Sequence, residues 1–173
     1  MQTPQDLRFG QIALLRCIYQ FELSGEPKSL PRARTSWKSK QKHYNPASKD
    51  LKTFKEFVKV AIPQTVVGYV YPSGVCVCVT LICYLKRPNY DFSNNQRGIG
   101  RLKGALPWTR PQVPDIDNLA KFILDGLNKL VYEDDRQVVK LVCYKLLDSV
   151  GECKGRTVVS ISTFDPTRDL PVG

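Results

Sequence analysis

The chain has 173 residues, of which 42% are hydrophobic and 24% charged, and its formal net charge is +10 at pH 7. This length suits one compact domain, and the composition excludes a fibrous or wholly disordered protein. The longest apolar run, Val75 to Leu85, is about half as long as a membrane-spanning helix, and the N-terminus has no export signal, so we expect no membrane partner.

The first part of the chain pairs a predicted strand with a basic loop. Ile18 to Leu23 predict the strand, which Gly25-Glu26-Pro27 ends. From Lys28 to Lys49 there are seven basic residues and no acidic one, with Trp37, His43 and Tyr44 among them. Cations that neutralise phosphates and aromatics that stack on bases are typical of a nucleic-acid-binding loop. The expected DNA contacts here are Lys28, Arg32, Arg34, Lys38, Lys40 and Lys42.

The next segment predicts a helix and then a hairpin. Ser48 is a suitable cap for a helix over Lys49 to Ile62, where apolar residues recur at helical spacing, and Pro63 ends it. Two β-rich runs, Val66 to Tyr71 and Val75 to Leu85, are separated by Pro72-Ser73-Gly74 and predict the hairpin. Within its second strand, Cys76 and Cys78 are expected to face the same side.

A second basic loop is predicted from Lys86 to Pro114, where Gly, Asn and Pro are frequent. Six Lys/Arg stand there against the single acid Asp91, and Arg101 and Lys103 are the expected DNA contacts.

The last third predicts a helix followed by two strands. Leu119, Phe122, Ile123, Leu127 and Leu130 form one apolar helical face, with Asp117 at the cap position. Val138 to Leu147 and Thr157 to Thr163 predict strands, and the tail from Asp165 is expected to fray. Strands and helices without a regular βαβ alternation predict an α+β fold: a mixed β-sheet with two main helices in a single domain. Several of the six cysteines lie in apolar runs, which favours a reducing intracellular compartment.

Acidic residues gather between Asp115 and Asp135, where six of the sixteen acids of the chain fall. In an extended Pro-Asp115-Ile-Asp117 both carboxylates project to one side, at the mouth of the predicted helix, and Lys121 follows Asp117 at i+4. Asp134 and Asp135 follow after the helix. Mg²⁺ prefers such oxygen ligands. Taken singly, these features are better explained as a helix cap, an ion pair of Lys121 with Asp117 or Asp125, and a solvated turn. Taken together, they favour a metal site and a structural role equally.

The run PDIDNLAKFILDGLNKLVYEDDRQVVKL resembles the signature of RusA-like Holliday-junction resolvases, and the resemblance covers about Phe21 to Ser162. It implies a homodimer that nicks the DNA of a four-way junction symmetrically. By position it makes Asp115, Asp117 and Asp135 the ligands of Mg²⁺, with Mn²⁺ as an alternative, and Lys121 the catalytic lysine. Asp134 is an additional candidate ligand.

The resemblance also organises the chain. It implies an N-terminal extension over residues 1–17, a RusA-like nuclease domain over 18–164 with basic loops at 28–49 and 86–113, and a tail over 165–173. By the same resemblance, the protein would be located in the cytoplasm or nucleoid of a bacterium or of a phage host. Residues 1–17 have no counterpart in the family pattern, and the segment 89–111 is longer than the usual connection.

Two other functions stay open. A non-catalytic DNA-binding protein would keep the basic loops, but it would gain nothing from carboxylates beside them. A related structure-selective nuclease would share the same metal site. The sole histidine, His43, and the absence of Cys-x-x-Cys exclude the common zinc sites and the Ser-His-Asp triad.

Overall fold

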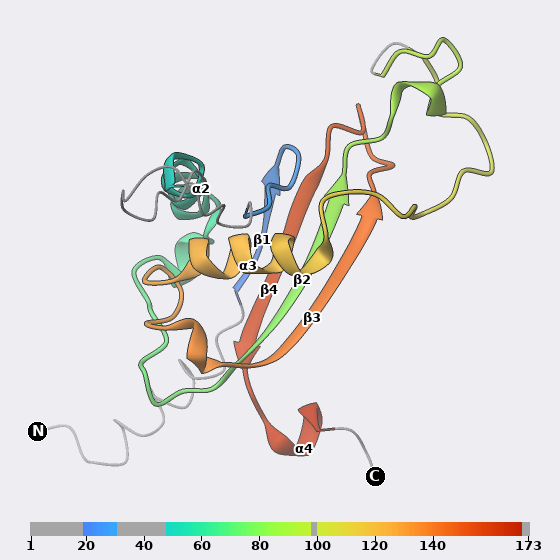
Figure 1. Ribbon diagram of the computed structural model, residues 1–173. Helices are drawn as coiled ribbons and strands as arrows, with labels where there is room; N and C mark the ends of the chain where they lie inside the picture. Colours follow the sequence, from blue (N-terminus) through green and yellow to red (C-terminus); the bar gives the residue numbers. More distant parts are fainter. Residues whose placement is uncertain (1–18, 31–47, 98–99, 171–173) are drawn as a thin grey trace, which may run out of the picture.

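The computed structural model describes residues 19–30, 48–97 and 100–170. Within them, four strands form one sheet in the order β1-β4-β2-β3 (Figure 1). β4 is antiparallel to β1 and β2, whereas β2 and β3 are parallel. The mixed sheet confirms the predicted α+β fold in a single domain. Its elements are β1 (Tyr19–Ser24), α2 (Ser48–Ala61), β2 (Val77–Leu85), α3 (Ile116–Leu127), β3 (Val138–Leu147), β4 (Arg156–Thr163) and α4 (Pro166–Asp169).

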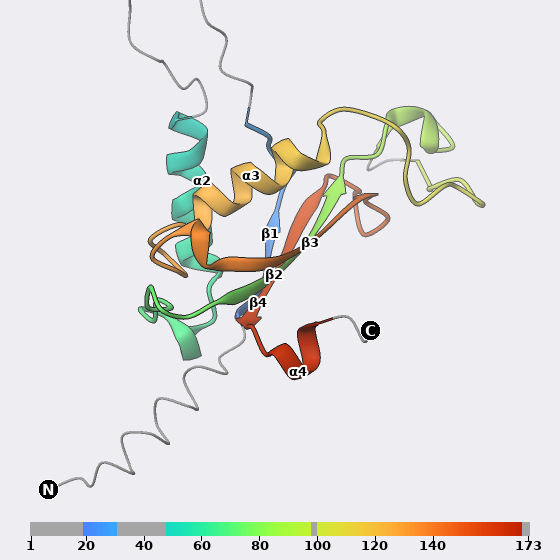
Figure 2. The same cartoon turned by 60° about the horizontal axis from the view of Figure 1, so that its bottom comes forward.

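The apolar core lies between one face of the sheet and the helices α2 and α3 (Figure 2). Residues of β2 alternate between buried and half-buried along its whole length, because successive side chains of a strand point to opposite faces. The buried face meets Val58 of α2 and Leu119 and Ile123 of α3. Of the described helices, α2 and α3 both lie on this buried face, and neither covers the other face of the sheet (Figure 2).

Close packing of α2 against α3 fixes how α3 is rotated. The rings of Phe54 and Phe122 meet edge to face, with centroids 5.1 Å apart. A Cβ atom on Gly126 would lie 2.3 Å from the Phe54 ring, so glycine lets the two helices approach this closely. The apolar side of α3 is thereby held inward, and its polar side faces away from the core.

The predicted hairpin is wrong. β2 begins only at Val77, and in the first run Tyr71 forms a single bridge, with Tyr132. The Gln137 side chain donates from Nε2 to the carbonyl oxygens of Pro72 (2.8 Å) and Val75 (2.9 Å), and the amide of Tyr71 donates to the carbonyl of Val131 (2.7 Å). These distant partners satisfy backbone groups that a hairpin would have paired.

Cys76 lies just before β2 and is exposed, whereas Cys78 lies in β2 and is half-buried, so Cys76 is outside the strand that was predicted to contain it. One smaller prediction also needs correction. The tail does not fray over its described part: Asp165 caps α4, and Asp169 forms an ion pair of 3.2 Å with Lys140 of β3. Over residues 19–30, 48–97 and 100–170, no helix is long and apolar enough to cross a bilayer.

Candidate functional site

The start of α3 carries the first two predicted ligands. Asp115 has an extended backbone and stands at the cap position, and the helix begins at Ile116. The amide of Leu119 donates to the carbonyl of Asp115 (3.1 Å), which closes the first turn. The prediction of Asp117 as the cap is therefore wrong, and the two aspartates do not form one extended pair. Both side chains are exposed, and the Asp115 carboxylate makes no capping hydrogen bond.

The polar side of α3 continues from Asp117 through Lys121 to Asp125. These residues follow one another at intervals of four, so they share one face of the helix. Eight residues of α-helix rise about 12 Å, which is the axial separation of Asp117 and Asp125. Lys121 is exposed between them, and Asp125 is half-buried.

The second acidic group lies in the 3-10 turn Asp135–Gln137, just before β3 and beside the C-terminal end of α3 in both views (Figures 1 and 2). Asp134 caps this turn, accepting from the amide of Arg136 (3.0 Å) and from its guanidinium (2.8 and 3.0 Å). These bonds hold the pKa of Asp134 well below its usual range. Asp134 thus has a structural partner here, whereas Asp135 is exposed.

The charge of Asp135 acts on Asp125. Burial raises the pKa of Asp125, the charge of Lys121 opposes this, and the charge of Asp135 adds to it. Burial also raises the pKa of Tyr132, and then the charges of Asp135 and Asp125 add to the effect. The ion pair of Lys121 with Asp117 or Asp125, which the sequence left open, does not form in the described part of the chain. No pattern in the sequence predicts that Asp125 lies near Asp135, because that proximity depends on the turn before β3.

The chemistry of these donors suits a divalent cation, since all are carboxylates. Across the described residues, none of Asp115, Asp117, Asp125 and Asp135 is neutralised by an ion pair. The same residues contain no group of three His, Cys, Asp or Glu side chains gathered closely enough to hold a metal ion. The assignment of Asp115, Asp117 and Asp135 as a shared ligand set therefore stays a prediction.

The predicted DNA-contacting residues are only partly described. Lys28 forms an ion pair with Asp50 at the start of α2. Arg101 is exposed, and Lys103 donates from Nζ to the carbonyl of Tyr90 (2.7 Å) within the long loop before α3. The remaining predicted contacts lie outside the described residues: Arg32, Arg34, Lys38, Lys40 and Lys42.

One family model and one curated relative are similar to this chain. The family model of endodeoxyribonuclease RusA matches residues 24–162, which include both acidic groups and Lys121. The uncharacterized protein YqaN of Bacillus subtilis (strain 168) is 32% identical to this chain over 126 residues. That alignment covers 72% of this chain and 84% of YqaN.

Proposed function

Because this chain belongs to the RusA family of endodeoxyribonucleases, we propose that it resolves four-way DNA junctions by metal-dependent, paired nicking, in recombination or repair. The observation that supports this best is the separation of charge. Exposed carboxylates without ion pairs occupy one side of α3 and the turn before β3, in a chain whose net charge is +10. A metal-dependent DNA nuclease needs both kinds of charge, because cations bind the phosphates of DNA and carboxylates bind the metal ion.

The family resemblance makes Asp115 and Asp117, at the start of α3, and Asp135, near its other end, the carboxylates that would bind Mg²⁺, or Mn²⁺ in its place. A divalent ion bound there would supply an activated water and offset charge on the phosphate. Asp134, which caps the turn, positions Asp135 next to it in the chain, rather than serving as a ligand itself. Asp125 adds negative charge beside Asp135.

Lys121 would stabilise the negative charge that develops at the scissile phosphate. It follows Asp117 by four residues, so both side chains leave the same face of α3. Its ammonium group has no ion pair to a described carboxylate, and its charge is available to a substrate. A fixed charge of this kind acts mainly in the transition state.

The homodimer would form through the sheet face that the main helices leave open. Ile82, Val142, Tyr144 and Val158 project from this face, where β2, β3 and β4 are in register, and Tyr144 is 50% exposed. The charged residues of this face are paired: Lys140 with Asp169, and Arg156 with Glu22. Two copies of a +10 chain can therefore meet here without strong repulsion.

Sedimentation of a Tyr144→Arg variant tests the dimer. We expect a monomer, because two arginines would be brought together in a desolvated interface. Val60→Arg, at an exposed position on α2 and therefore on the opposite side of the sheet, should stay dimeric. A Tyr144→Arg dimer as stable as the wild type would exclude this face as the interface.

We propose that the nuclease domain spans residues 18–164 and includes both basic loops. Residues 1–17 would then be an N-terminal extension, and residues 165–173 a C-terminal tail. The described cysteines are all free thiols, which suits a reducing intracellular compartment such as a bacterial cytoplasm or nucleoid.

The deciding experiment is incubation of the purified protein with labelled four-way, duplex and single-stranded DNA, with Mg²⁺ or with EDTA. We expect symmetric nicks in the four-way DNA alone, and none with EDTA. Binding without cleavage in Mg²⁺ and in Mn²⁺ would indicate the binding-protein alternative. Equal cleavage of other branched substrates would indicate a broader structure-selective nuclease.

A further inference from the structure

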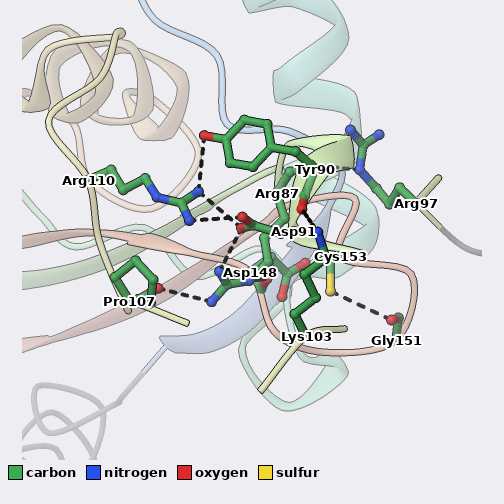
Figure 3. A network of polar contacts seen from close by, with 10 residues as sticks. All are labelled: Arg87, Tyr90, Asp91, Arg97, Lys103, Pro107, Arg110, Asp148, Gly151 and Cys153. Atoms are coloured by element: carbon green, nitrogen blue, oxygen red, sulfur yellow. Dashed lines mark hydrogen bonds and ion pairs between the residues drawn. The ribbon is translucent and has the colours of Figure 1, made fainter. Parts of the chain in front are cut away.

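The long loop between β2 and α3 is built around a buried carboxylate (Figure 3). Asp91 is 1% exposed and accepts from Arg87 (3.0 Å) and from both terminal nitrogens of Arg110 (2.8 and 3.1 Å). Burial alone would raise the pKa of Asp91, but the hydrogen bonds from Arg110 and Arg87 outweigh it and hold the pKa below its usual range. The loop therefore has a charged core of its own.

The same loop is tied to the sheet at its base. The Arg87 guanidinium also donates to the carbonyls of Asp148 (2.7 Å) and Pro107 (3.2 Å). The amide of Leu147, the last residue of β3, donates to the carbonyl of Trp108 (2.7 Å). Trp108 thus lies between two anchored positions, Pro107 and Arg110, and its backbone is fixed as well.

Two large aromatic side chains stand exposed on this rigid support. Trp108 is 69% exposed and Tyr90 is 59% exposed. The guanidinium of Arg110 lies over the Tyr90 ring, 5.2 Å from its centroid, and also approaches the Tyr90 hydroxyl (3.3 Å). Single exposed apolar residues are ordinary on protein surfaces. Here the two aromatics are held by one charged core, and the exposed cations Arg101 and Lys103 belong to the same loop.

We propose that Trp108 and Tyr90 stack on nucleobases that are left unstacked at the branch point of DNA, while the loop cations bind the flanking phosphates. The inference rests on the proposed function, because it takes branched DNA as the ligand. Aromatic rings stack on every base, so this contact recognises an unstacked base rather than a sequence. The loop ends at Pro114, directly before Asp115, so a bound branch point would lie near the start of α3.

The fluorescence of Trp108 tests the contact directly. The chain has two tryptophans, so Trp108 is the sole reporter in a Trp37→Phe background. In EDTA, where no cleavage is expected, a four-way junction or a duplex with a bulged base should quench this fluorescence. A fully paired linear duplex should quench it much less, because its bases stay stacked.

Affinity measurements separate stacking from charge. Trp108→Ala and Tyr90→Ala should each weaken junction binding by about 5- to 140-fold, and linear duplex binding by little. The slope of log K against log salt should not change, since no cation is lost. Trp108→Phe should retain most of the affinity. Leu170→Ala changes a similarly exposed residue next to α4, which lies at the opposite end of the sheet from this loop (Figure 1), and it should bind as the wild type does.

Equal affinity of Trp108→Ala and wild type for the junction, with matched thermal stability, would overturn the inference even if the protein cuts junctions. An equal loss for linear duplex would overturn it too. Quenching by branched DNA in a protein that never cleaves would refute the proposed nuclease and leave the stacking contact standing.

Discussion

Two sets of aspartates in this chain differ in burial and in ion pairing. Asp91 and Asp148 are buried, and each accepts from an arginine side chain: Asp91 from Arg87 and Arg110, and Asp148 from Arg156. Asp115, Asp117 and Asp135 are exposed and form no ion pair within the described residues. A basic chain has ample cations to pair with every acid. Carboxylates left unpaired in such a chain are therefore available for a ligand, whereas the paired ones hold the structure.

The strongest test of this division is Asp117→Asn and Asp135→Asn. Both changes should abolish cleavage, because each removes a negative charge from the metal site. Junction affinity should stay equal or rise, since repulsion of phosphate falls. Stability should change by less than about 0.5 kcal/mol, as for other exposed positions. Single-turnover cleavage and urea unfolding measure these effects, and cleavage at the wild-type rate in both variants would refute the metal assignment.

The matching change in the buried set is Asp91→Asn. It should lower the free energy of unfolding by about 3–5 kcal/mol, because Arg87 would be left buried without its counter-charge. Urea denaturation measures the loss. Asp115→Asn is the control, because the same chemical change is made at an exposed carboxylate without an ion pair. Equal stability of the two variants would contradict the contrast between the regions.

Lys121→Ala addresses the one cation on the polar side of α3. We expect turnover to fall by about 10²- to 10³-fold, with a much smaller change in affinity, because the charge acts on the transition state. Lys121→Arg keeps the charge and should retain part of the activity. Weakened binding with an unchanged single-turnover rate would make Lys121 a phosphate anchor only.

The smallest effect is expected from the loop cations. Replacing Arg101 and Lys103 by Ala should reduce the slope of log K against log salt by about one unit for each lost phosphate contact. Saturating DNA should then restore most of the single-turnover cleavage. Lys154→Ala serves as the control, because Lys154 is already paired with Glu152. An unchanged slope in the double variant would remove these two residues from the DNA interface.

Local patterns in the sequence predicted most of the fold. The helix α2 and the strands β1, β3 and β4 lie within one residue of their predicted bounds, because apolar periodicity and proline positions decide them locally. The helix α3 was also predicted, but it ends at Leu127, three residues before the last apolar residue assigned to it, Leu130. The hairpin failed because the Gln137 side chain, more than sixty residues away, takes the place of a strand partner. The local alternation of apolar and polar residues cannot reveal a hydrogen-bonding partner that is so distant in the sequence.

The sequence predicted which residues belong to the candidate site better than it predicted how they are arranged in space. The motif identified the aspartates and Lys121, but it did not show that Asp135 lies beside Asp125 near the far end of α3. The core of the long loop was missed as well, although a signal existed. Asp91 is the single acid of a basic stretch, and a lone acid among arginines and lysines is a strong candidate for a buried ion pair.

The anchored base of the long loop bears on how this chain tolerates changes in length. Arg87 and Arg110 both donate hydrogen bonds to the Asp91 carboxylate. The 22 residues between the two arginines are therefore closed into a loop by contacts at its base. Doubling the length of a flexible loop costs only about 0.6 kcal/mol in closure entropy. Insertions or deletions inside the loop, between Asp91 and Pro107, should therefore leave α3 and its aspartates in place. The loop can diverge rapidly in evolution, or accept a grafted segment, while the catalytic scaffold stays the same.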